Sequence, residues 1–146
     1  MEPIEKTIND TISNFKKDKV QMIKKIQEEF QLQISEDLIE EMIMNISLRK
    51  FISEIEICVS KFLNSRNLKS KNKIYFKKDW EVYEFIKIIL LLNFKDISFE
   101  EECKLWGEII KLLEDKIDNT IKSNSGNMKK ELFGLKRRLY ILLDFD

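Results

Sequence analysis

The segment Val82–Phe94, with the sequence VYEFIKIILLLNF, restricts the folding of this chain more than any other segment. Ten of its thirteen residues are apolar, and the polar exceptions are Glu84, Lys87 and Asn93. An isolated buried strand would lack partners for its backbone groups, and the flanking segments have helical periodicity. We therefore expect a helix over about residues 80–93, covered by neighbouring helices over most of its circumference.

The composition indicates one globular domain that spans residues 1–146. Hydrophobic residues make up 43% of the chain and charged residues 36%. No apolar stretch reaches the roughly 20 residues of a membrane-spanning helix, and the N-terminus lacks a signal-peptide pattern, so we expect a cytoplasmic location. The chain has no alanine but 22 isoleucines and 22 lysines. This bias indicates AT-rich coding, as in a low-GC bacterium or its phages, with AT-rich eukaryotes and viruses as alternatives.

Residues 3–30 are expected to form the first helix, with Pro3 in its first turn. Its apolar residues recur mostly at steps of three or four, which gives a narrow stripe like that of a coiled coil. Either this helix packs on its own bundle, or residues 1–30 form an arm that pairs with a second copy or with a partner protein. The candidate stripe for partner binding or self-association consists of Ile4, Ile8, Ile12, Phe15, Met22 and Ile26.

Capping residues and apolar periodicity predict further helices. Ser35 and Ser98 are suited to N-cap positions, because acidic residues and then an apolar stripe follow each of them. A break is expected near Asn45–Ser47, where the apolar pattern moves to the opposite helix face. The predicted helices cover residues 36–46, 48–63, 99–121 and 128–143.

These elements predict an all-α fold, an irregular bundle of five to six helices around the central apolar helix. The helices 99–121 and 128–143 are expected to pack on it as an antiparallel pair. Residues 64–73 form a polar linker, and Ile74–Phe76 is expected to be extended. Gly107 costs its helix about 1 kcal/mol relative to alanine, which predicts close approach of another backbone.

Several kinds of catalytic site are excluded by residue type. The chain has no histidine, so it has neither a Ser–His or Cys–His nucleophile pair nor a Cys–His zinc site. Cys58 and Cys103 are expected to be free buried thiols. A carboxylate-only magnesium site is the remaining option, but the acidic residues lie largely opposite the apolar stripes. We therefore expect no cofactor, no metal and no enzymatic activity, with a magnesium-dependent nucleotide hydrolase as a third alternative.

A basic segment over residues 61–78 is the clearest candidate binding site. It contains seven positive residues and no acid, and aromatic residues are interleaved, a combination suited to phosphate contact and base stacking. The zero net charge of the whole chain argues against nucleic acid and leaves a solvated loop or an acidic protein partner as alternatives. The candidate patch consists of Lys61, Arg66, Lys69, Lys71, Lys73, Tyr75, Lys77, Lys78, Arg137 and Arg138.

The sequence therefore favours a non-enzymatic protein-interaction module that occludes or scaffolds a partner protein. Small inhibitors, immunity proteins, counter-defence proteins and adaptor subunits belong to this class. The alternative is a nucleic-acid-binding accessory subunit that uses the basic segment. A protein partner is expected, self-association through the first helix is the second option, and no membrane contact is expected.

Overall fold

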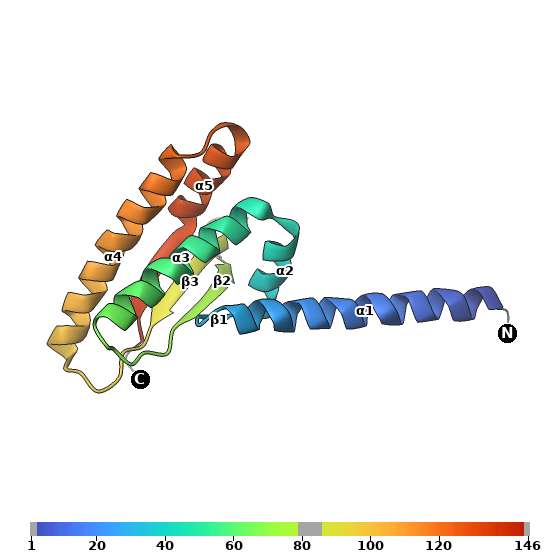
Figure 1. Cartoon of the computed structure of the whole chain (residues 1–146), viewed down its shortest axis with the longest axis horizontal. Helices are drawn as coiled ribbons and strands as arrows, with labels where there is room; N and C mark the ends of the chain where they lie inside the picture. The colour runs from blue at the N-terminus through green and yellow to red at the C-terminus, as the bar shows by residue number, and fades with distance from the viewer. Residues whose placement is uncertain (1–2, 79–85, 145–146) are drawn as a thin grey trace.

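The computed structural model describes residues 3–78 and 86–144 as a mixed α and β body from which one long helix projects (Figure 1). Within these residues the chain forms five α-helices and four β-strands. In chain order they are α1 (Pro3–Glu29), β1 (Gln33–Ile34), α2 (Glu36–Met44), α3 (Ile46–Ser65), β2 (Lys73–Lys78), β3 (Ile86–Leu92), α4 (Phe99–Lys122), α5 (Gly126–Arg138) and β4 (Leu139–Leu143).

The four strands form one mixed sheet in the order β1-β2-β3-β4. Strands β2 and β3 are antiparallel, with Ile74 opposite Leu90. Strand β1 runs parallel to β2, and β4 runs parallel to β3. Because β3 is paired on both sides, its backbone N–H and C=O groups are satisfied within the sheet.

The prediction of an all-α bundle around a central helix is wrong. Residues 86–92, which belong to the predicted helix 80–93, form strand β3, and residues 79–85 lie outside the described part. We rejected a strand here because an isolated strand would lack backbone partners. The tertiary structure supplies those partners from β2 and β4, which are distant from each other in sequence.

The predicted helix 128–143 is also wrong in its last part. Helix α5 ends at Arg138, and residues 139–143 continue as strand β4. The segment fits both periodicities, since Leu139 and Leu142 extend the helical stripe while Leu139, Ile141 and Leu143 alternate as in a strand. Pairing with β3 decides between the two.

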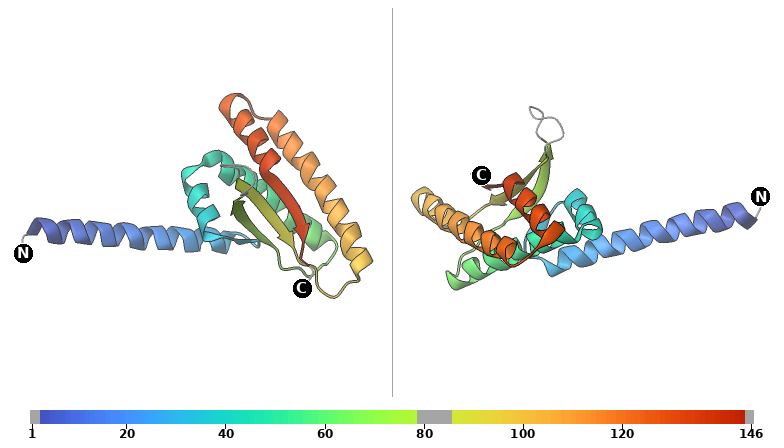
Figure 2. Two further views of the ribbon diagram at one scale, coloured as in Figure 1. Left: turned by 180° about the vertical axis from the view of Figure 1, so that it is seen from behind. Right: turned by 90° about the horizontal axis from the view of Figure 1, so that it is seen from above.

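Helices α3, α4 and α5 lie on one face of the sheet, and none of the described helices covers the opposite face (Figure 2). The core therefore forms between these helices and one set of alternating strand residues. Leu90 at the centre of β3 has no exposed surface. The buried residues at this interface include Ile74, Ile88 and Leu92 from the strands, Phe51, Ile52 and Ile55 from α3, and Leu105, Ile109 and Leu113 from α4.

The predicted break and the predicted cap at Ser98 are confirmed, whereas Ser35 precedes α2 without a side-chain capping bond. Asn45 separates α2 from α3, and its side-chain oxygen accepts a hydrogen bond from the N–H of Leu48. The hydroxyl of Ser98 accepts one from the N–H of Glu101 at the start of α4. The explanation of Gly107 is wrong, because no atom lies within 4 Å of the position that its Cβ would take.

Candidate interaction surfaces

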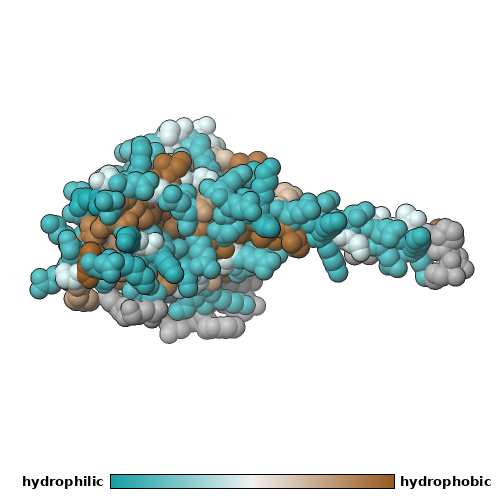
Figure 3. Space-filling model, turned by 60° about the horizontal axis from the view of Figure 1, so that its bottom comes forward, coloured by the Kyte–Doolittle hydropathy of each residue, from teal (hydrophilic) through white to brown (hydrophobic). Residues whose placement is uncertain are grey.

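Helix α1 carries the candidate apolar stripe, and its outer part projects from the body (Figure 1). Ile4 is 71% exposed and Ile8 is 52% exposed, and Met22 is also exposed. Ile26 is half-buried against the core, while the side chains of Ile12 and Phe15 lie outside the described part of the chain. On the face shown in Figure 3, the outer part of the arm is mainly hydrophilic, so the apolar stripe is narrow.

The base of α1 is fixed to the body by hydrogen bonds from one side chain. The amide nitrogen of Gln27 donates to the carbonyl of Leu32 at 2.9 Å, and its amide oxygen accepts from the N–H of Ile34 at 2.9 Å. These bonds pair the outer edge of β1 as a neighbouring strand would. An ion pair of 3.3 Å between Lys19 and Glu40 of α2 adds a second attachment. The contacts set the direction in which α1 leaves the body.

The structure does not keep the predicted basic patch together. Lys61 lies on α3 and Arg66 is the C-cap residue directly after it, and both line a groove against α4. Lys73, Tyr75 and Lys77 lie on β2, and alternation places these three side chains on one face of the sheet. The two groups therefore belong to different surfaces of the body.

Arg138 does not join the other residues of the predicted patch, because its side chain contacts Phe76 and Ile86. Its guanidinium lies over the ring of Phe76, 5.9 Å from the centroid, and its Nε donates to the carbonyl of Ile86 at 2.6 Å. Burial lowers the pKa of Arg138, and the carboxylate of Glu41 partly opposes that change. Lys78 lies on the opposite alternation of β2, and Arg137 lies on α5. Lys69 and Lys71 precede β2, and Lys71 lines a hollow together with Lys73.

The uncovered side of the sheet forms a continuous surface, which we call the open face. Strand register brings Tyr75, Ile89 and Tyr140 into one row across three strands. Tyr140 is 39% exposed, whereas Ile89 between the tyrosines is only 2% exposed. The open face consists of Lys73, Tyr75 and Lys77 of β2, Lys87, Ile89 and Leu91 of β3, and Tyr140 and Leu142 of β4.

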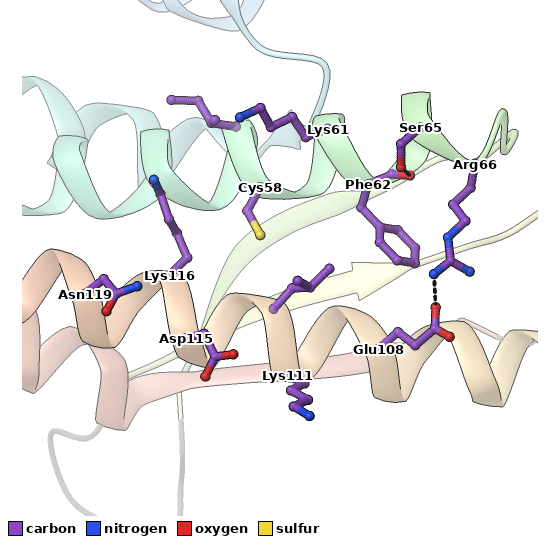
Figure 4. A pocket seen from close by; sticks show the side chains of 12 residues that line it. Cys58, Lys61, Phe62, Ser65, Arg66, Glu108, Lys111, Asp115, Lys116 and Asn119 are labelled. Carbon is purple, nitrogen blue, oxygen red and sulfur yellow. Dashed lines mark hydrogen bonds and ion pairs between the residues drawn. The ribbon is translucent and has the colours of Figure 1, made fainter.

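A groove of about 910 Å³ runs between α3 and α4 (Figure 4). Its floor contains apolar side chains such as Phe62, and its rim is charged. Arg66, at the C-cap of α3, and Glu108 of α4 form an ion pair of 2.8 Å across the groove. Burial raises the pKa of the Cys58 thiol, which faces the groove, and so disfavours the reactive thiolate.

Both cysteines are free thiols, as predicted, and each is half-buried. In residues 3–78 and 86–144, no group of three or more cysteine, aspartate or glutamate side chains is arranged to hold a metal ion. Glu40 forms an ion pair with Lys19, and Asp118 forms one with Lys136. None of the described helices combines the length and apolarity needed to cross a lipid bilayer.

Three residues that shape these surfaces were not singled out from the sequence. Trp106 donates from its indole nitrogen to the carbonyl of Ile141 at 2.9 Å and thereby covers part of the outer edge of β4. Tyr140 completes the aromatic row, and Gln27 anchors the arm. Only the tertiary pairing of β4 gives Trp106 and Tyr140 these roles, and no local sequence signal marks Gln27, which lies among charged residues.

Comparison with protein-family models, with curated proteins and with solved structures finds no match for this chain.

Proposed function

We propose that this chain is a non-enzymatic protein-interaction module whose arm pairs with the arm of a second copy. The observation that carries the proposal is the exposure of Ile4 and Ile8 on a helix that projects from the body. Most helical stability in proteins comes from packing of an apolar face, and the outer part of α1 has no such packing within the described chain. Pairing two narrow stripes would provide that packing.

The charges along the arm support an antiparallel arrangement of the two helices. Residues 2–10 contain Glu2, Glu5 and Asp10 against Lys6, which gives a side-chain charge of −2. Residues 11–19 contain three lysines, at positions 16, 17 and 19, against one aspartate, which gives +2. Antiparallel pairing sets the acidic half of one arm against the basic half of the other. It also keeps the two bodies at opposite ends of the pair.

Two bodies held by paired arms would suit occlusion or scaffolding of a partner protein. This is the role that the sequence favours, as in small inhibitors, immunity proteins, counter-defence proteins and adaptor subunits. The proposal gives the arm the task of association and leaves the body to contact further partners.

Light scattering after size exclusion, over a wide range of protein concentration, tests the pairing. The chain has a mass of 17.6 kDa, and we expect twice that mass at high concentration. The double variant Ile4→Glu with Ile8→Glu should weaken association at least tenfold, because two apolar contacts are lost from each arm. The matched control is Asn9→Glu with Ser13→Glu, which adds the same charge on the far side of the helix and should leave the mass unchanged. A monomer at every concentration would refute self-pairing.

The orientation is tested by exchanging charges between the two halves of the arm. Lys16→Glu with Lys17→Glu makes both halves acidic and should weaken an antiparallel pair. Adding Glu2→Lys and Glu5→Lys to the same chain should restore it. A parallel pair predicts no such rescue, because each half then faces its own copy.

A further inference from the structure

The open face of the sheet has the side chains of a surface that binds single-stranded nucleic acid. It lies on the body, and its properties do not depend on pairing of the arm. Its central row holds Tyr75 and Tyr140, two strand spacings or about 10 Å apart, with Ile89 between them. Aromatic side chains on an open sheet stack with bases irrespective of sequence, because every base has an apolar face.

Positive charge flanks the tyrosine row on both sides along β2. Lys73 and Lys77 are exposed, and each is two residues from Tyr75 on the same face. The described strands contain four lysines and no acidic residue, although the chain as a whole is neutral. The charge of this surface is therefore complementary to a phosphate backbone.

A pair of lysines also lies directly across β2 and β3. Lys77 is the cross-strand partner of Lys87, so two like charges are adjacent on the same face. A phosphate above this pair would contact two ammonium groups. The ammonium of Lys87 lies over the ring of Tyr140, 4.8 Å from its centroid, so this ring already takes part in a cation–π contact.

The geometry points to a single-stranded nucleic acid on the open face, with bases on Tyr75 and Tyr140 and phosphates on Lys73, Lys77 and Lys87. A duplex fits less well, because paired bases do not present their faces to a flat sheet. A protein partner also fits less well, since lysine is depleted at protein interfaces and the four described strands contain lysines but no acidic residue. Leu91 of β3, which is partly exposed, adds an apolar side chain to the same face.

Fluorescence anisotropy with labelled oligouridylate and oligodeoxythymidylate, followed over a salt series, tests the inference. Tyr75→Leu and Tyr140→Leu should each weaken binding roughly fivefold or more, because a stacked base is lost. Tyr75→Phe and Tyr140→Phe keep the rings and should retain the affinity. Phe133→Ala is the matched control, since this ring is exposed on α5 away from the open face.

The salt dependence separates phosphate contact from stacking. Lys73→Ala and Lys77→Ala should each reduce the slope of log K against log salt by about 0.7, the value for one contact to a single strand. The tyrosine variants should lower the affinity without changing the slope. Lys129→Ala and Lys130→Ala remove the same charge from α5 and should have little effect.

Three results would overturn the inference. The first is no binding of either oligonucleotide at low salt, and the second is equal affinity for a duplex. The third is binding that survives the tyrosine-to-leucine variants or that falls equally with Lys129→Ala and Lys130→Ala. If the open-face variants change the oligomeric mass instead, the face belongs to a protein interface and the inference is wrong.

Discussion

The arm and strand β3 are both rich in isoleucine, yet one is exposed and the other is buried. Ile8 on α1 is 52% exposed, whereas Ile88 and Leu90 on β3 have no exposed surface. The difference does not come from side-chain type. Strand β3 has a neighbouring strand on each side and helices on one face, whereas the outer part of α1 has no neighbour within the described chain. Burial of an apolar segment therefore depends on the elements that pack against it, and its apolar content alone does not determine burial.

The largest effect is expected at the centre of β3. Leu90→Ala leaves a cavity between the sheet and the helices and should lower the free energy of unfolding by about 3 kcal/mol. Urea denaturation followed by circular dichroism measures this loss. Leu142→Ala is the matched control, because the same change on the partly exposed open face should cost less than about 1 kcal/mol. Equal losses in the two variants would contradict burial of only one sheet face.

A smaller effect is expected where α4 protects the edge of the sheet. Trp106→Phe removes the donor to the carbonyl of Ile141 and should lower the free energy of unfolding by about 1 kcal/mol. Amide hydrogen exchange should also quicken in β4, because this strand lies at the edge. Unchanged exchange in β4 would show that the indole does not hold the strand in place.

The smallest effect on the stability of the body is expected in the arm. In dilute solution, where the arms are unpaired, Ile4→Glu with Ile8→Glu should change the free energy of unfolding by less than about 0.5 kcal/mol. Both side chains are exposed and contact nothing in the core. A loss above about 1 kcal/mol would show that the stripe packs on its own body, and the contrast with β3 would disappear.

The helices that the sequence predicts correctly depend on local signals. The stripe of residues 3–30, the break at Asn45 and the cap at Ser98 each involve groups within one or two turns of one another, and the structure has all three. The extended Ile74–Phe76 segment is also correct, as the centre of β2. The candidate residues Lys73, Tyr75 and Lys77, predicted from the basic segment 61–78, all lie in β2.

The two strands that were missed depend on pairing between distant segments. Residues 86–92 have no periodicity that separates a strand from a buried helix, because the run is apolar on both faces. Residues 139–143 fit the periodicity of a helix and also that of a strand. Pairing of Ile89 with Tyr140 settles both segments, and fifty residues separate these two positions. No local pattern contains that information.

The same distinction applies to the candidate surfaces. The sequence by itself determined the narrow stripe of the arm and the basic character of residues 61–78, because periodicity and charge are properties of one segment. Only the tertiary structure decided which stripe remains uncovered, separated Lys61 and Arg66 from the strand lysines, and brought Tyr140 beside Tyr75. The reason is physical, because burial and proximity are set by the surfaces that meet when the chain folds.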